Sequence, residues 1–92
     1  MTAETKRAEA KMILQSPHKV LVLTALSYVN LTDQELDVLI LRHMRGQTQE
    51  VVAEKLHYTT NGLQKIEYKA LDKCYEVWKN MLFVREILKT AR

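Results

Sequence analysis

Residues 59–71, which read TTNGLQKIEYKAL, carry the side chains whose types and spacing are best suited to recognising a polar surface. If this stretch is helical, its apolar side chains share one face: Leu63, Ile66 and Ala70. The other face carries hydrogen-bonding groups: Asn61, Gln64, Lys65 and Tyr68. Asparagine and glutamine amides can hydrogen-bond an adenine edge at two points, and a lysine can reach guanine acceptors or a phosphate. The pattern therefore predicts one face for a core and one for hydrogen bonding.

Two sets of candidate contacts to a nucleic acid follow from this chemistry. The side chains that could reach base edges lie near the start of the stretch: Thr60, Asn61, Gln64 and Lys65. The side chains that could meet phosphates lie at helix starts or on the flanks: Thr48, Thr59, Tyr68, Lys69 and Arg45. Each of these residues could also be ordinary solvated surface, so both interpretations stay open at this stage.

The sequence gives little support for catalysis or metal binding. The sequence contains no pattern of paired carboxylates, no nucleophile with its base and no glycine loop that could cradle a phosphate. We therefore expect neither an enzyme nor a cofactor. His18, His43 and His57 form no metal-ligand spacing with Cys74, which is expected to pack as a small apolar side chain. No metal site is predicted.

Length and charge set broad limits. The 92 residues suffice for one domain, residues 1–92, with a modest core, and the single cysteine rules out an internal disulfide. Because no leading apolar stretch has the length of a signal peptide or membrane span, we expect a cytoplasmic protein that enters no membrane. The formal charge of +3, from 14 basic and 11 acidic residues, permits an anionic partner without requiring one.

Helices are the elements that must position the polar face. Only two glycines and one proline interrupt the chain, so the sequence predicts an all-α fold of four to five helices. The first helix is expected over residues 3–14. A second is expected to begin with Ser16 as its N-cap and Pro17 at its first helical position, and to run to about Val29. Residues 1–30 would then form an N-terminal helical extension.

The clearest helix-start signal is LTDQEL, because Thr32 and Glu35 have the spacing of a capping box. Two further residues have the spacing of the hydrophobic staple around this box: Leu31 and Leu36. A third helix should therefore begin at Asp33 and end at Gly46, a C′ glycine. Its expected buried side chains are Leu36, Leu39, Ile40 and Met44.

Two short helices joined by a tight turn are expected next. Thr48 should cap a fourth helix ending near Leu56, and Thr59 or Thr60 should cap a fifth. This is the spacing of a helix-turn-helix, whose second helix can lie in the DNA major groove. Ala53 must be small where the helices cross, and a generic helical hairpin would satisfy much of the same pattern. The expected core between the two helices is Val52, Leu56, Leu63 and Ile66.

Residues 31–73 resemble region 4 of the sigma-70 class of RNA polymerase factors and, more loosely, the DNA-binding domain of LuxR-type regulators. The likeness lies in LTDQELDVLILRHMRGQT, VVAEKL and above all QKIEYKALDK. The last segment is close to the family's recognition-helix pattern, arginine-glutamine-isoleucine-glutamate-alanine-lysine-alanine-leucine-arginine-lysine. The resemblance implies a four-helix DNA-binding module that places residues 60–69 in the major groove of a promoter element. It also implies a pair between Glu67 and Arg42, although an exposed Glu67 is an equally simple interpretation.

The chain departs from this family at the positions that read the promoter. The family's arginine and glutamate pair falls at Thr60 and Asn61, and Gly62 stands where another arginine is common. Val51 replaces an acidic residue, and His57 replaces a frequent glycine. The scaffold is kept while the reading side chains differ. This combination indicates a small stand-alone regulator of the kind encoded by phages and mobile elements, since the chain is too short for a complete sigma factor.

Two classes of function stay open. The preferred hypothesis is a sequence-specific transcription regulator that binds double-stranded DNA through the helix beginning near Thr60. The alternative is a protein-interaction module on a region 4 scaffold, which binds RNA polymerase, a sigma factor or a phage packaging partner. Gln64, Lys65 and Lys69 favour DNA, while the mild net charge and the missing arginines favour the alternative.

Residues 74–92 continue the apolar stripe of the recognition helix as a C-terminal helix extension. The stripe has alternating spacings of three and four: Leu63, Ile66, Ala70, Cys74, Val77, Met81, Val84 and Leu88. It predicts a single helix of about thirty residues and about 45 Å. A second stripe widens the apolar arc after Cys74: Leu71, Tyr75, Trp78 and Leu82.

This wide apolar arc must be covered. Apolar side chains of the N-terminal helices could cover one side: Met12, Ile13, Val20, Leu21, Leu23, Leu26 and Val29. A second copy of the chain could cover the other side and form a homodimer with two DNA readers. The candidate dimer or core surface is Tyr75, Trp78, Met81 and Leu82.

Overall fold

The computed structural model describes residues 2–90, in which all regular secondary structure is helical. The elements are α1 (Ala3–Leu14), α2 (Lys19–Ser27), α3 (Asp33–Leu39), the π-helix η1 (Ile40–Met44), α4 (Gln49–Leu56), α5 (Thr60–Trp78) and α6 (Leu82–Thr90). The predicted all-α class is confirmed, with six α-helices in the described part of the chain rather than four to five. Within residues 2–90, no helix is both long and apolar enough to cross a membrane.

The starts of α3 and α4, predicted from local signals, are confirmed. Thr32 and Glu35 form a reciprocal capping box at the start of α3, in which the Thr32 N–H donates to Glu35 Oε1 at 2.9 Å. The Thr48 hydroxyl accepts from Val51 N at the start of α4. Gly46 has a φ of 68°, the left-handed conformation expected after a helix end. These contacts satisfy backbone groups that have no partner inside the helices.

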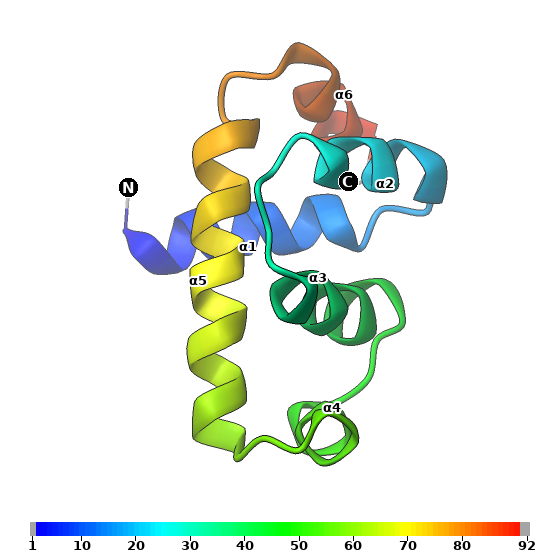
Figure 1. Ribbon diagram of the computed structural model, residues 1–92. Helices are drawn as coiled ribbons and strands as arrows, with labels where there is room; N and C mark the ends of the chain where they lie inside the picture. Colours follow the sequence, from blue (N-terminus) through cyan, green and yellow to red (C-terminus); the bar gives the residue numbers. More distant parts are fainter. Residues whose placement is uncertain (1, 91–92) are drawn as a thin grey trace.

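The longest helix, α5, is the element on which the others pack (Figure 1). Figure 1 shows α1 crossing behind α5, with α3 beside its middle and α4 beside its first turn. The main core lies where α1, α2, α3 and α6 meet the second half of α5. Its fully buried members on α5 are Ala70, Leu71 and Cys74.

A second, smaller core lies between the helices of the predicted helix-turn-helix. Its buried members are Val38, Val52, Ala53 and Leu63, with Leu56 and Ile66 partly buried against them. Ala53 is 3 % exposed, so the expectation that this position must be small is consistent with its packing. The sequence missed Val38, which comes from α3 and closes the cluster from a third side.

The third helix keeps its predicted ends but changes its winding. It passes from α3 into the π-helix η1, and its last residues include the buried His43. Leu39 is buried as expected. The other three residues predicted to be buried on this helix are only half-buried: Leu36, Ile40 and Met44. A π-turn inserts a residue into the helical repeat and rotates the side chains that follow, which can explain the position of Met44 but not that of Leu36, which precedes η1.

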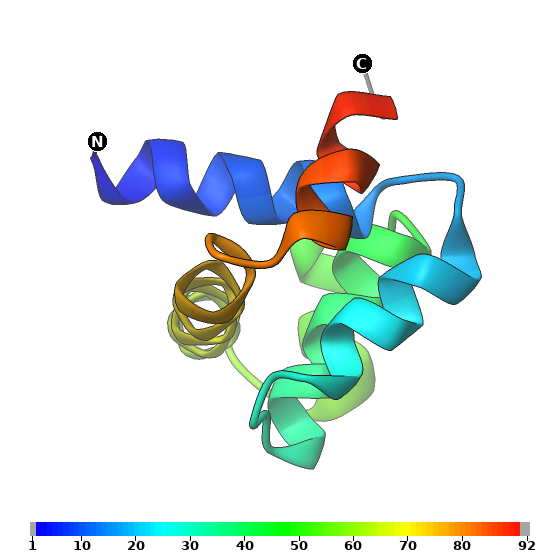
Figure 2. The same ribbon diagram turned by 90° about the horizontal axis from the view of Figure 1, so that it is seen from above.

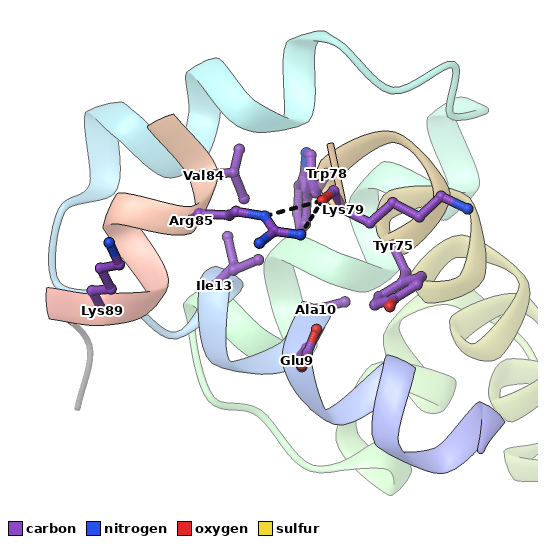
Figure 3. Close-up of a pocket in the computed structure, with 9 residues that line it drawn as sticks. All are labelled: Glu9, Ala10, Ile13, Tyr75, Trp78, Lys79, Val84, Arg85 and Lys89. Carbon is purple, nitrogen blue, oxygen red and sulfur yellow. Dashed lines mark hydrogen bonds between the residues drawn. The ribbon is translucent and has the colours of Figure 1, made fainter. Parts of the chain in front are cut away.

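The prediction of one long C-terminal helix is wrong. The fifth helix ends at Trp78, where Met81 N donates to the Trp78 carbonyl at 3.0 Å, and α6 then packs back against α1. Arg85 secures this reversal, because its Nε and Nη2 atoms donate to the Lys79 carbonyl at 3.2 and 2.9 Å (Figure 3). The apolar residues beyond Trp78 therefore belong to a separate helix, whose Val84 and Ile87 join the main core. The side chain of Leu88, assigned to the stripe, lies outside the described residues.

Trp78 lies inside the core of the single chain. It is 2 % exposed, and its indole Nε1 donates to the Ala25 carbonyl of α2 at 2.9 Å. Of the other residues on the candidate dimer or core surface, Tyr75 and Met81 are half-buried and Leu82 is 81 % exposed. Beside Trp78, a pocket of about 300 Å³ opens between α1, the end of α5 and α6, with Arg85 lying across it (Figure 3).

The second helix differs from its prediction at its start. It begins at Lys19 with His18 at the N-cap, so Ser16 does not cap it. Ser16 is buried instead, and its hydroxyl accepts from His18 N at 3.3 Å. Pro17 therefore lies in the connection and not in the helix. Three side chains of α2 that were expected to cover the apolar arc after Cys74 point outward instead: Val20, Leu21 and Leu23 are between 44 and 76 % exposed.

Candidate nucleic-acid interface

The connection between α4 and α5 is a tight turn of three residues, 57–59. His57 takes the left-handed conformation, with φ 61° and ψ 43°, and Tyr58 N donates back to the Ala53 carbonyl at 2.8 Å. In Figure 1, α4 is seen nearly end-on while α5 runs along the page, so the two axes are steeply inclined. This is the arrangement of a helix-turn-helix, in which the start of the second helix is left open.

The start of α5 is held by its own cap. Thr59, one of the two predicted caps, accepts from Gly62 N at 3.0 Å, and Thr60 is the first helical residue. A Cβ at Gly62 would lie 3.1 Å from the Thr59 hydroxyl, so glycine gives this cap room. The remaining first-turn N–H groups of α4 and α5 have no partner within their helices, which makes both starts suitable for an anion.

The four candidate base-reading residues lie together at this end of α5, but not in equal environments. Thr60, Asn61 and Lys65 are exposed. Gln64 is half-buried, and its Nε2 atom donates to the Tyr68 hydroxyl at 2.8 Å. Three of the four are therefore open to a partner, and the fourth is already engaged within the helix.

The candidate phosphate contacts are more dispersed. Thr48, Thr59 and Lys69 are exposed on α4 and α5, and Arg45 is exposed after η1. Tyr68 is half-buried, because the guanidinium of Arg7 from α1 lies 4.4 Å from its ring centroid. Arg7 in turn forms two hydrogen bonds with Asp72, at 2.9 and 3.0 Å. Asp72 holds the pKa of Arg7 above its usual value. The part of α5 that carries Tyr68 and Asp72 is therefore in contact with α1 and forms a junction between the two helices.

A shallow groove beside this junction is lined by three lysines of α5 and by two of its carboxylates, Asp72 and Glu76. Its lining includes Arg7, Lys65, Tyr68, Lys69 and Lys73. Arg7 is paired with Asp72, and Lys73 pairs with Glu35 at 2.7 Å. Within residues 2–90, Lys65 and Lys69 form no ion pair, so their ammonium groups are available to an anionic partner.

Beneath the exposed start of α5, a buried ionic cluster fixes the helix to its neighbours. Glu67 is 1 % exposed and accepts from Arg42 Nε at 3.0 Å and from Gln49 Nε2 at 3.4 Å. The His43 Nε2 atom lies 3.4 Å from the same carboxylate. The pair between Glu67 and Arg42 implied by the family resemblance is therefore present and buried.

The negative charge of Glu67 is stabilised by its neighbours despite burial. Burial alone would raise the pKa of this carboxyl, but His43 and Arg42 outweigh that effect and lower the pKa to about 2. Arg42 also donates from Nη1 to the Gln47 carbonyl at 2.6 Å, which ties the loop before α4 into the cluster. No local pattern predicts the roles of His43 and Gln49, because their convergence on Glu67 depends on how three helices pack.

Other side chains with reactive chemistry are not gathered into a site. Cys74 is fully buried, and burial followed by the nearby charge of Glu35 raises the pKa of its thiol to about 12. Within the described part of the chain, no group of three or more histidine, cysteine, aspartate or glutamate side chains could hold a metal ion. The pocket beside Trp78 contains none of the candidate DNA contacts.

Comparisons of the chain with models of known protein families, with curated proteins and with solved structures find no match.

Proposed function

We propose that this protein is a sequence-specific, DNA-binding transcription regulator that reads the major groove with the start of α5. The observation that carries the proposal is the row of polar side chains at that start: Thr60, Asn61, Gln64 and Lys65. The row stands on a helix anchored by a buried core on one side and by the Glu67 cluster on another. A rigid support of this kind is what base readout requires, since the side chains must meet base edges in a fixed register.

Two further features support the proposal. The capped starts of α4 and α5 offer backbone N–H groups that suit phosphates on either side of the groove. The likeness of QKIEYKALDK to the recognition helix of sigma-70 region 4 points to the same use of this surface. This likeness and the short length of the chain favour a small stand-alone regulator of the phage or mobile-element kind, acting in the cytoplasm.

The test is binding to duplex DNA, measured by fluorescence anisotropy as a function of salt and followed by selection of preferred sequences. Gln64→Ala should lose about 1 to 3 kcal/mol of discrimination between the selected site and random duplex. Lys65→Ala should lower affinity, and its salt dependence should fall by about one unit if Lys65 contacts a phosphate. Matched controls are Gln15→Ala and Lys89→Ala, which remove the same chemistry from exposed positions outside α4 and α5.

Unchanged binding in both α5 variants, with helical content preserved, would refute this assignment of the reading face. The two controls should bind DNA as the unaltered protein does. If they weaken binding as much as the α5 variants, the interaction is general attraction to a basic chain and not recognition by α5.

A second candidate function is a protein-interaction module that binds RNA polymerase, a sigma factor or a phage packaging partner. The observation in its favour is the outer surface of α4, where Glu50 and Glu54 are exposed beside Val51, which is 43 % exposed. Two carboxylates and an apolar side chain are poorly suited to lie near DNA phosphates. This function predicts no duplex binding even at low salt, together with direct binding to purified RNA polymerase or sigma factor that Val51→Asp weakens.

A further inference from the structure

We infer that a second copy of this chain binds to the outer face of α2, so that two α2 helices pack antiparallel in a homodimer. The face, called here the α2 face, consists of Val20, Leu21, Leu23, Thr24, Ser27 and Tyr28. It differs from the surface proposed from the sequence, because Trp78 and α6 fill the chain's own core.

The exposed apolar surface of the described residues is concentrated on this one helix. Six large apolar side chains are strongly exposed, and four of them belong to α2 or its C-cap. Their exposed fractions are 76 % for Val20, 44 % for Leu21, 50 % for Leu23 and 61 % for Tyr28. Single exposed apolar residues are normal, whereas a cluster of them marks an interaction site.

The Thr24 and Ser27 hydroxyls within the α2 face already have hydrogen-bond partners. The Thr24 hydroxyl donates to the Val20 carbonyl at 2.8 Å, and the Ser27 hydroxyl donates to the Thr24 carbonyl. Burying the face would therefore leave these two donors paired, which avoids the main cost of burying hydroxyls. Both side chains are small and lie near the centre of the face at helical spacing, so another helix can approach closely.

The lack of charge on this face favours a second copy as the occupant. Residues 20–32 contain no charged side chain, so a partner must also present an uncharged surface to avoid burying an unpaired charge. Among the described residues, the α2 face is itself such a surface, and a two-fold axis places it against its own copy. The two other strongly exposed apolar side chains, Val51 and Leu82, lie on different helices.

The ends of α2 favour the antiparallel orientation. The helix has no basic residue in its last turn, and Lys19 stands exposed at its start, donating to the Met44 carbonyl at 3.3 Å. Antiparallel packing would bring each Lys19 near the C-terminal end of the partner's α2, where a cation is favourable. Parallel packing would place the two lysines together.

The position of α2 leaves the candidate DNA-reading surface open. Figure 1 shows α2 at one end of the molecule and α4 with the start of α5 at the other, and Figure 2 shows α2 at the periphery when the molecule is seen from above. A nine-residue helix is about 14 Å long, so its contact is smaller than a standard interface of about 800 Å² per partner. The dimer should accordingly be weak and depend on concentration.

The test is sedimentation velocity without DNA, from about 1 µM to about 1 mM, the range in which weak dimers dissociate. The unaltered protein should shift from monomer to dimer. Val20→Glu and Leu23→Glu should each weaken the dimer at least about 100-fold, because the two-fold axis buries two like charges. Val51→Glu is the matched control, since it places the same charge on an exposed apolar position of α4 and should leave the dimer unchanged.

Cysteine cross-linking locates the contact independently. Thr24→Cys should form an intermolecular disulfide under mild oxidation, whereas Glu54→Cys on α4 should not, and the native Cys74 is buried. A monomer throughout the concentration range, or a dimer unaffected by both glutamate variants, would overturn the inference. Binding of the monomer to phosphatidylglycerol vesicles through Val20 and Leu23 would assign the face to a membrane and overturn it as well. None of these measurements contains DNA, so their failure is distinct from failure of the proposed function.

Discussion

Replacing Glu67 with glutamine tests how much the fold depends on the ionic cluster beneath α5. The variant keeps the size of the side chain but removes the negative charge that faces Arg42 and His43. The difference between the pKa of about 2 in the folded chain and the ordinary value of 4.5, at about 1.4 kcal/mol per pH unit, corresponds to about 3 kcal/mol. Removing one partner of a buried ion pair commonly costs about 3 to 5 kcal/mol, which agrees with this value.

The same pKa fixes the direction of the acid response. The folded pKa of Glu67 lies below its unfolded value. The stability that ionised Glu67 adds to the fold is therefore complete above about pH 4.5 and is lost as the pH falls toward about 2. Glu35 acts in the same direction: burial opposes its charge, but the hydrogen bonds from Lys73 and Thr32 lower its pKa. The unaltered chain should therefore lose stability in acid, and Glu67→Gln should lose less.

The assay is urea unfolding followed by far-ultraviolet circular dichroism at about pH 7 and about pH 3, on either side of the unfolded pKa. Glu76→Gln is the matched control, because Glu76 lies on the same helix but is exposed, in a pair with Lys79. It should cause no measurable loss. The reasoning would be refuted if Glu67→Gln cost less than about 1 kcal/mol at pH 7, or if its stability fell in acid as steeply as that of the unaltered chain.

Three further substitutions test the packing and the turn. Ala53→Leu should lower the free energy of unfolding by about 1 to 3 kcal/mol, because the small core between α4 and α5 has no room for it; an unchanged urea midpoint would show that the helices do not meet there. Trp78→Ala should cost about 3 to 5 kcal/mol and remove the indole hydrogen bond to the Ala25 carbonyl; calorimetry of the unfolding transition measures this loss, and a water-exposed emission spectrum of Trp78 in the folded protein would contradict its burial. His57→Gly should raise stability by about 1 kcal/mol, since glycine relieves the left-handed strain; a lower melting temperature would show that the imidazole contributes more than the strain costs.

The parts of the fold that the sequence predicted depend on signals only a few residues apart. The capping box joins Thr32 to Glu35, and the caps at Thr48 and Thr59 act on the N–H group three residues later. Such contacts form whenever the local chain is helical, so neighbouring residues suffice to predict them. The small core between α4 and α5 could also be predicted from residues close in sequence, because α4 and the connection to α5 are short.

The reversal before α6 could not be read from apolar spacing. The turn spans residues 79–81, which is close to one helical repeat, so the apolar stripe resumes in nearly the same phase after the break. A continuous helix and a helix interrupted by such a turn therefore give almost the same pattern. No glycine or proline marks the turn, and the Arg85 contact with the Lys79 carbonyl is visible only in three dimensions.

The orientation of α2 was undetermined for a different reason. Apolar residues occupy most of its positions, so no single face is distinguished as the buried one. The structure buries Val22, Ala25 and Leu26 and exposes Val20, Leu21 and Leu23. A uniformly apolar helix can cover a core on one side and bind a partner on the other, and the sequence alone does not separate these roles.

The hydrogen bond between Gln64 and Tyr68 orients one side chain of the proposed reading face. While one N–H of Nε2 donates to the Tyr68 hydroxyl, Gln64 keeps its second N–H and its carbonyl oxygen. These two groups are the ones that recognise adenine at two points, so the bond to Tyr68 can hold the amide in place for that contact. Tyr68 is in turn held by Arg7 and, through it, by Asp72, so a contact from the N-terminal helix constrains a side chain at the start of α5. Any sequence preference of Gln64 should therefore depend on α1, a dependence that residue spacing within α5 cannot reveal.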